Sequence, residues 1–243
     1  MPPVQETREG RLPLISLVPN IVTLLGLSVG LTSIRFTFDN RFDIAAGLLI
    51  LAALIDGLDG LLARRLNAAS PFGAELDSLS DFVCFGVAPA LLVYHFGLGN
   101  LAGMGWLAAL FFAICCCLRL ARFNVAAKGE TSDDKQSFTG VPAPAGAMLG
   151  IFPVTLYLAD FVDLRDLQLL VAIWMLAVGA MMIARFKTLS LKAMRISRDN
   201  AVYVLLAAAV IIGLMLTRLW LFHVAATVLY LSLLAWGVAK RRL

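Results

Sequence analysis

Charged residues are scarce in this chain, and their scarcity excludes an ordinary soluble domain. Only 15% of its 243 residues are charged and 60% are hydrophobic, whereas soluble domains have about 25% charged and about 45–50% apolar residues. A chain of 243 residues has room for several membrane spans of ~20 residues joined by short loops. The composition therefore predicts an integral membrane protein.

Cysteine and clustered basic residues are also sparse, and this excludes two further classes. The four cysteines are Cys84, Cys115, Cys116 and Cys117. Three consecutive cysteines in an apolar segment have no spacing for a metal cage or a disulfide framework, so we expect them to pack as small apolar residues. The basic residues lie at the ends of apolar segments, without interleaved aromatics, and do not predict a nucleic-acid partner.

Long apolar segments dominate the sequence and predict an all-α membrane protein of about eight transmembrane helices. They lie at 18–38, 42–66, 76–97, 103–126, 141–160, 165–184, 200–217 and 219–239. We divide the chain into an N-terminal cytoplasmic or interfacial segment (1–17), a six-helix core (18–184), and a basic loop with two C-terminal helices (185–243). The N-terminal segment has no pattern of a cleaved signal peptide, so we expect the first span to be retained.

The distribution of positive charge predicts the orientation of these spans. Eight spans would place both termini on one side of the membrane. Of the 20 Lys and Arg residues, sixteen fall on the side of the termini; the other four are Arg35, Arg41, Arg165 and Arg218. Because the loops richer in Lys and Arg remain in the cytoplasm, we expect both termini to be cytoplasmic.

Four aspartates interrupt the apolar pattern in the segment ALIDGLDGLLARRLNAASPFGAELDSLSDF (53–82). On a helix, Asp56, Asp59, Gly60, Ala63 and Arg64 fall within one arc of about 140°. Leu58, Leu61 and Leu62 lie on the opposite face. Acidic residues in membrane helices are costly and usually mark a functional site in the bundle interior.

The second pair, Asp77 and Asp81, is separated by four residues and shares a face of the next helix. A short connection can bring all four carboxylates together on the predicted cytoplasmic side.

Hard divalent cations, bound through oxygen, would neutralise these four carboxylates, and paired metals can clamp a phosphoryl group. Gly60 and Gly73 would let a bulky ligand approach the backbone, and Arg64 could bind phosphate oxygens. We infer a metal-dependent site for a diphosphate-containing substrate. The alternative is that the aspartates form salt bridges with Arg64, Arg65 and other basic residues at helix ends.

These residues resemble the signature of the CDP-alcohol phosphatidyltransferase family. The pattern Asp56-x2-Asp59-Gly60-x2-Ala63-Arg64-x8-Gly73-x3-Asp77-x3-Asp81 matches it at every specified position. The resemblance implies a six-helix fold, a homodimer, and transfer of a phosphatidyl group from CDP-diacylglycerol to an alcohol with release of CMP. The last two helices would be an addition found in some branches of the family.

Site roles follow from the same resemblance. Asp56, Asp59, Asp77 and Asp81 would bind Mg²⁺ or Mn²⁺, with two ions per site, and Asp81 would also be the general base. Gly60, Ala63, Arg64 and Gly73 would line the CDP-lipid pocket. The segment VPNIVT (18–23) resembles a further family element, through which Asn20 and Thr23 would contact the nucleotide. A helix cap and a hydroxyl bonded within its own helix are the alternatives for these two residues.

Two other segments, LRLARFN (118–124) and FTGVPAPAGA (138–147), resemble the branch of the family that uses L-serine as the acceptor. The forked guanidinium groups of Arg119 and Arg122 suit the carboxylate of an amino acid, and Asn124 is a further polar candidate. Membrane anchoring or binding of lipid phosphate is the alternative for the arginines. Glycerol 3-phosphate and inositol phosphate are alternative acceptors, because each also brings an anion.

Two unrelated functions remain as alternatives. An intramembrane prenyltransferase also uses aspartate pairs, but on helices farther apart in sequence and without the Gly60, Ala63 and Arg64 pattern. An ion-coupled transporter could use the acids as cation sites, although transporters tend to show internal repeats and broken helices near the midplane. No repeat is visible in the sequence.

Overall fold

The computed structural model describes residues 17–66, 70–101, 103–128, 140–184 and 213–239, and all regular elements in these ranges are helices. Helices α1 (Val18–Phe38) and α2 (Phe42–Arg65) form an antiparallel hairpin. Its turn contains Asn40 in the left-handed region, with φ 55°. The buried Ser33 hydroxyl donates to the Ala45 carbonyl oxygen across 2.8 Å, which links the two helices. Asparagine tolerates this conformation better than most residues, so the turn suits its sequence.

A long continuous rod follows the hairpin. It consists of α3 (Pro71–Asp81), the π-helical turn η2 (Phe82–Val87), α4 (Ala88–Val93) and a second π-helical turn, η3 (Tyr94–Leu98). The Ser70 hydroxyl caps α3 by accepting from the Gly73 amide across 3.0 Å, and Pro71 occupies the first turn, where no amide partner is needed. The rod begins earlier than the predicted span 76–97, because this cap and proline start the helix at 71.

The other half of the bundle contains α5 (Met104–Lys128), which packs against α8 (Gln168–Ile183). Two short helices, α6 (Ala143–Gly150) and α7 (Phe152–Leu158), lie between them in sequence. The apolar segment predicted at 141–160 is therefore not one continuous helix, and its role as a membrane span is not confirmed. Pro153 has no amide hydrogen to continue the helix, and the Leu149 carbonyl four residues earlier accepts instead from Trp174 Nε1 across 2.8 Å.

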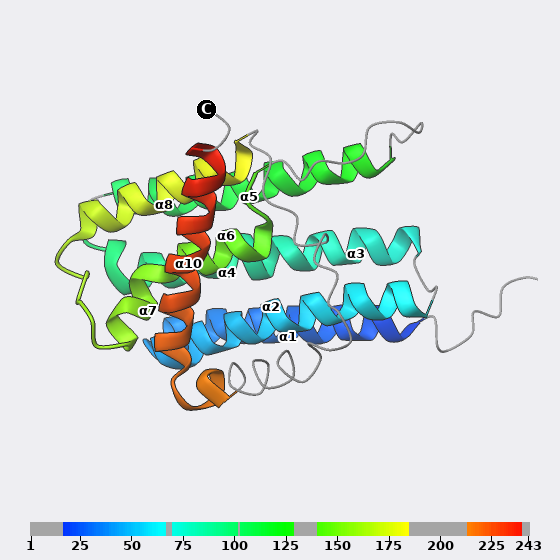
Figure 1. Cartoon of the computed structure of the whole chain (residues 1–243), viewed down its shortest axis with the longest axis horizontal. Coiled ribbons are helices and arrows are strands. Elements are labelled where there is room, and N and C mark those ends of the chain that lie inside the picture. Colours follow the sequence, from blue (N-terminus) through cyan, green and yellow to red (C-terminus); the bar gives the residue numbers. More distant parts are fainter. Residues whose placement is uncertain (1–16, 67–69, 102, 129–139, 185–212, 240–243) are drawn as a thin grey trace, which may run out of the picture.

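The last described helix, α10 (Leu219–Ala239), crosses the direction of α1, α2, α5 and α8 (Figure 1). Its Trp220 lies near α2, since a β-carbon on Gly47 would be 3.8 Å from the Trp220 ring. Farther along, His223 is hydrogen-bonded to Thr155 of α7 across 3.0 Å. The helix thus connects parts of the bundle that are distant in sequence.

Five helical segments are long and apolar enough to cross a membrane: 18–38, 42–62, 71–98, 104–126 and 219–237. The predicted number of eight is not confirmed. Helix α8 has 16 residues, α6 and α7 are shorter, and the predicted span 200–217 lies mostly outside the described ranges, as do segment 1–16 and most of the loop 126–140.

Large apolar side chains cover much of the outer surface, as expected of a protein whose solvent is lipid. Examples are Ile21, Leu24, Leu31, Leu107 and Leu170, which are 48–62% exposed. On the face of α2 opposite the aspartates, Leu58 and Leu61 are exposed and Leu62 is half-buried. All four cysteines are free, and Cys84, Cys115 and Cys116 are buried as predicted, while Cys117 is exposed. Within the described ranges the chain is all-helical, and its long apolar helices are those of an integral membrane protein.

Candidate metal and phosphotransfer site

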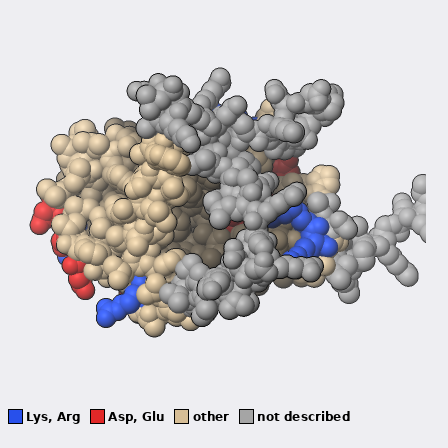
Figure 2. Space-filling view, in the orientation of Figure 1, with Lys and Arg blue, Asp and Glu red and all other residues tan. Residues whose placement is uncertain are grey.

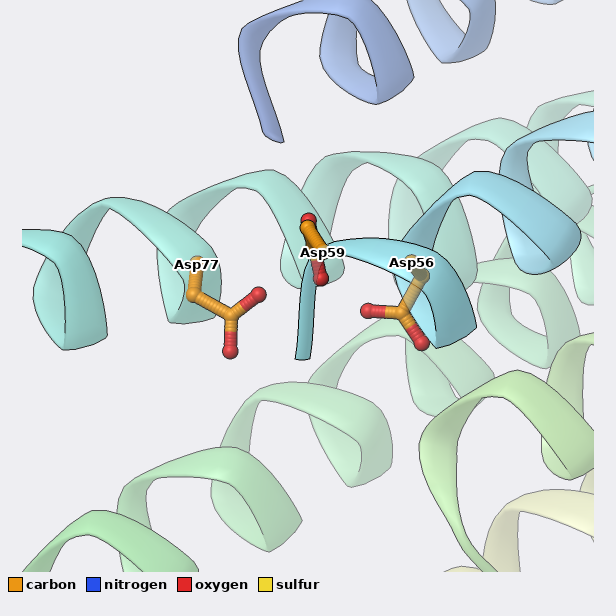
Figure 3. Close-up of side chains that lie close together, drawn as sticks. All are labelled: Asp56, Asp59 and Asp77. Atoms are coloured by element: carbon orange, nitrogen blue, oxygen red, sulfur yellow. The ribbon is translucent and has the colours of Figure 1, made fainter. Parts of the chain in front are cut away.

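Three of the four aspartates form one cluster. Asp56 and Asp59 come from the last turns of α2 and Asp77 from the middle of α3. One carboxylate oxygen from each lies within 4.8 Å of the others. Figure 3 shows the Asp56 and Asp77 carboxylates turned toward each other, with Asp59 between them. The prediction that these side chains converge therefore agrees with the geometry.

Asp81 lies one turn beyond Asp77 and joins the same cluster from deeper in the bundle. Its carboxyl group is within hydrogen-bonding reach of Asp56. Asp81, Asp56 and Asp59 line a small cavity together with Thr23, Gly26 and Cys84. Four carboxylates from two helices thus share one space, in which full ionisation requires a compensating positive charge.

The donor set suits a hard divalent cation. Magnesium binds carboxylate oxygens at about 2.0–2.1 Å, so ligands of one ion lie roughly 3–4 Å apart, and the 4.8 Å limit of the cluster needs only small side-chain rotations to reach that spacing. The ion pairs in the described part of the chain are Arg35–Asp39 and Arg165–Asp163. None of the four clustered aspartates therefore forms an ion pair with an arginine in these ranges.

Thr23 of α1 supports the cluster from the side. Its buried hydroxyl is 2.9 Å from Asp59 Oδ2 and 3.1 Å from the Pro19 carbonyl oxygen. The Ser80 hydroxyl of α3 donates to the Thr23 carbonyl across 3.4 Å. Thr23, which the sequence assigned to nucleotide binding, is thus placed to orient a candidate metal ligand, because outer hydrogen bonds fix the geometry of ligating carboxylates.

The other predicted nucleotide-binding residues surround the open end of the cluster. A β-carbon on Gly73 would lie 2.8 Å from Asn20 Oδ1, so the starts of α1 and α3 are in close contact. A β-carbon on Gly60 would lie 3.5 Å from Arg64 Nη1, so the exposed Arg64 folds back over a bare stretch of backbone. Ala63 lies on the same helix. The face in Figure 2 is hollowed, with acidic atoms inside and basic atoms at one rim.

The predicted acceptor residues lie on α5 and have different surroundings. Arg119 is partly buried, interacts electrostatically with Asp81, and its Nε has no hydrogen-bond partner among the described residues. Arg122 Nη1 donates to the Ile183 carbonyl at the end of α8 across 3.0 Å. Asn124 Oδ1 accepts from the Ser78 hydroxyl across 3.0 Å, which links α5 to α3. Of these three residues, Arg119 is therefore the one with an unpaired donor nitrogen in the described ranges.

Five cavity-lining residues were not predicted: Gly26, Ala52, Ser80, Cys84 and Phe85. Ser80 and Cys84 had a detectable signal, because positions 77, 80, 81 and 84 fall on one helical face. Gly26 had no comparable signal. It belongs to a different helix, and only the packing of α1 against α3 brings it to the site.

The part of the chain that carries this site is similar to known proteins. Residues 16–184 match the family described as CDP-alcohol phosphatidyltransferase. A protein of Mycobacterium leprae named CDP-diacylglycerol–serine O-phosphatidyltransferase is 39% identical over 173 residues, which is 70% of this chain and 57% of the relative. One of the same name from Methanocaldococcus jannaschii is 38% identical over 170 residues, covering 70% of this chain and 72% of the relative.

A third relative, named archaetidylserine synthase, comes from Methanothermobacter thermautotrophicus and is 35% identical over 169 residues, covering 69% of this chain and 67% of the relative. This chain spans little more than half the length of the mycobacterial relatives it matches. The match over 16–184 nevertheless includes all four aspartates and the helices that carry them. The chain belongs to the CDP-alcohol phosphatidyltransferase family.

Proposed function

We propose that this protein transfers the phosphatidyl group of CDP-diacylglycerol to the hydroxyl of L-serine, forming phosphatidylserine and CMP. The convergence of four carboxylates from α2 and α3, with Arg119 of α5 beside Asp81, carries the proposal. The names of the relatives support serine as the acceptor. This activity belongs to phospholipid biosynthesis.

Asp56, Asp59, Asp77 and Asp81 would hold the divalent metal, with two ions per site of Mg²⁺ or Mn²⁺. When bound, the ions supply positive charge that polarises the diphosphate and stabilises the departing CMP. Asn20, Gly60, Ala63, Arg64 and Gly73 would bind the nucleotide end of the CDP-lipid. Thr23 would contribute through its bond to Asp59. The acyl chains would remain in the membrane beside the site.

Asp81 would act as the general base. It lies deeper in the cavity than Asp77, next to Asp56 and Arg119. It would take the proton from the serine hydroxyl as the serine oxygen forms a bond to the lipid-side phosphorus. The bond from that phosphorus to the CMP oxygen breaks, and CMP leaves with the electron pair. Positioning and charge stabilisation provide most of the rate enhancement in such transfers.

Arg119, Arg122 and Asn124 would bind the acceptor. A guanidinium group holds a carboxylate through two parallel hydrogen bonds, which suits serine. Glycerol 3-phosphate and inositol phosphate are the competing acceptors, because a phosphate can occupy the same position. The relatives' names favour serine over both.

We also infer a homodimer in the inner membrane of a prokaryote, with both termini and the active site cytoplasmic. The sixteen-to-four distribution of Lys and Arg supports the orientation, and family resemblance supports the dimer. The core would be residues 18–184, flanked by segments 1–17 and 185–243. Labelling of cysteines introduced near each terminus, from either side of sealed vesicles, tests the orientation.

The decisive experiment measures CMP release by the purified full-length protein in detergent, with CDP-diacylglycerol, metal and one acceptor at a time. We expect release that requires L-serine and produces an aminophospholipid. Release with glycerol 3-phosphate or inositol phosphate instead would disprove the serine assignment but keep the phosphatidyl transfer. No release with any acceptor, from a folded sample with metal, would disprove the transfer and return attention to ion transport.

The Asp81→Asn variant tests the general base. Asparagine is similar in size but cannot take up the proton, so we expect turnover to fall by at least about 100-fold, within the range that general bases contribute. Binding of CDP-diacylglycerol, measured by equilibrium dialysis with labelled lipid, should change little. A variant that retains more than a tenth of the parent turnover would contradict this role.

A further inference from the structure

Helix α10 carries a polar stripe on the face that packs against the bundle. His223, Thr227 and Tyr230 are spaced by four and three residues and therefore share one face. His223 and Thr227 are buried, and Tyr230 packs against the core with its hydroxyl inaccessible. Polar groups buried in a membrane helix are costly and tend to mark function. This helix lies outside residues 16–184, which carry the family match.

The two ends of the stripe differ in their contacts. His223 Nδ1 is hydrogen-bonded to the Thr155 hydroxyl of α7 across 3.0 Å, which anchors this part of α10. Seven residues, or about 10 Å, farther along the helix, the Tyr230 hydroxyl has no hydrogen-bond partner in the described ranges. The stripe is thus anchored by a hydrogen bond at His223, and its other end, at Tyr230, has an unpaired hydroxyl.

Tyr230 is close enough to Arg119 for the two side chains to interact electrostatically, and Arg119 also interacts with Asp81. Arg119 Nε, like the Tyr230 hydroxyl, is buried and lacks a partner among the described residues. Two neighbouring buried donors are therefore unsatisfied, and leaving buried donors unpaired is unfavourable. An anion with two oxygens would satisfy both.

The size and chemistry of the proposed acceptor match this arrangement. Its hydroxyl must reach Asp81, and its carboxylate is the group that needs donors a few ångströms away. A guanidinium donates only, and a phenol can donate one hydrogen bond. Together they suit a carboxylate, whereas the protonated amino group of serine, itself a donor, has nothing to bind on Arg119.

We propose that Tyr230 and Arg119 together bind the carboxylate of the acceptor amino acid, so that α10 completes the acceptor pocket. This assignment rests on the proposed function. Tyr230 then discriminates among acceptors: it favours a carboxylate-bearing alcohol over one that lacks the carboxylate.

The test compares Tyr230→Phe with the parent in the full-length protein. Phenylalanine keeps the ring packing and removes only the hydroxyl. We expect KM for L-serine to rise about 10- to 100-fold, as for loss of one hydrogen bond to a charged group, with kcat and KM for CDP-diacylglycerol within about twofold of the parent. The matched control is Tyr157→Phe, whose ring contacts Arg165 and Phe96 away from the aspartates. It should leave all three constants unchanged.

Two competitive inhibitors separate a carboxylate contact from a change of shape. The compound 3-hydroxypropanoate has the hydroxyl and carboxylate of serine, and ethanolamine has its hydroxyl and amine. In Tyr230→Phe, Ki for 3-hydroxypropanoate should rise by the same factor as KM for serine, while Ki for ethanolamine stays unchanged. An equal rise for both inhibitors would overturn the carboxylate assignment.

The outcomes also distinguish this proposal from the proposed function. If the parent does not use serine at all, the function assignment fails first. If the parent uses serine and Tyr230→Phe has an unchanged KM for it, with an unchanged melting temperature, only the role of Tyr230 is overturned.

Discussion

At the scale of single residues, the contacts of Thr23 show how a small side chain can control a charged site. Its hydroxyl is 2.9 Å from Asp59 Oδ2, in a buried position. A hydrogen bond to an ionised group is worth about 1.5–3 kcal/mol, more than most single surface contacts. The orientation of Asp59 thus depends on a residue from another helix.

Replacing Thr23 with valine should weaken metal binding. Valine has nearly the same shape but no hydroxyl, so Asp59 loses its orienting partner, and loss of such outer contacts costs about 10- to 100-fold in metal affinity. The measurement is the Mn²⁺ concentration that gives half-maximal activity, supported by direct Mn²⁺ titration.

The control for this substitution is Thr37→Val. Thr37 is also buried on α1, but its hydroxyl donates to the Ser33 carbonyl across 3.0 Å within the same helix. Its removal should leave the metal response unchanged. Equal effects from the two variants would show that Thr23 acts only through helix stability.

At the scale of helices, the close contact of α1 with η2 positions the deeper part of the site. Cys84 lies three residues beyond Asp81, and its thiol is 3.5 Å from the Gly26 carbonyl oxygen. A β-carbon on Gly30 would lie 2.5 Å from Cys84 Sγ. The absence of a side chain at Gly30 therefore sets the distance between these two segments.

Gly30→Ala should be destabilising, because overpacking of a tight contact costs typically about 1–3 kcal/mol. Adding Cys84→Ala removes the sulfur atom and should restore much of the loss, since the remaining neighbours of the new β-carbon lie at 3.4 Å. Thermal unfolding of both single variants and the double variant in detergent measures the coupling. Additive effects would contradict a direct clash.

At the scale of the whole molecule, the proposed metal site would link two helices whose carboxylates repel each other without a cation. Asp56 and Asp59 belong to α2, and Asp77 and Asp81 to α3. A ligand that binds only the folded state stabilises it by about 2.7 kcal/mol at a concentration 100 times its Kd. Binding of the proposed metal and folding of this end of the bundle would therefore be coupled.

We expect Mn²⁺ or Mg²⁺ to raise the melting temperature of the parent and EDTA to reverse the change. Asp56→Asn should respond less, because one ligand is lost. Without metal this variant should melt at or above the parent temperature, because one repelling charge is gone. A parent that shows no metal-dependent shift would argue against a metal bound by these carboxylates.

The sequence by itself determined the helical membrane class, the ends of α1 and α2, and the grouping of the aspartates. These features depend on hydropathy and on spacings within one or two helices, which periodicity reads directly. Tertiary structure decided the rest. Pro153 breaks the predicted span at 141–160, Thr23 bonds to Asp59 on another helix, and α10 brings Tyr230 to Arg119. These outcomes depend on packing between segments distant in sequence, for which the order of residues along one helix carries no signal.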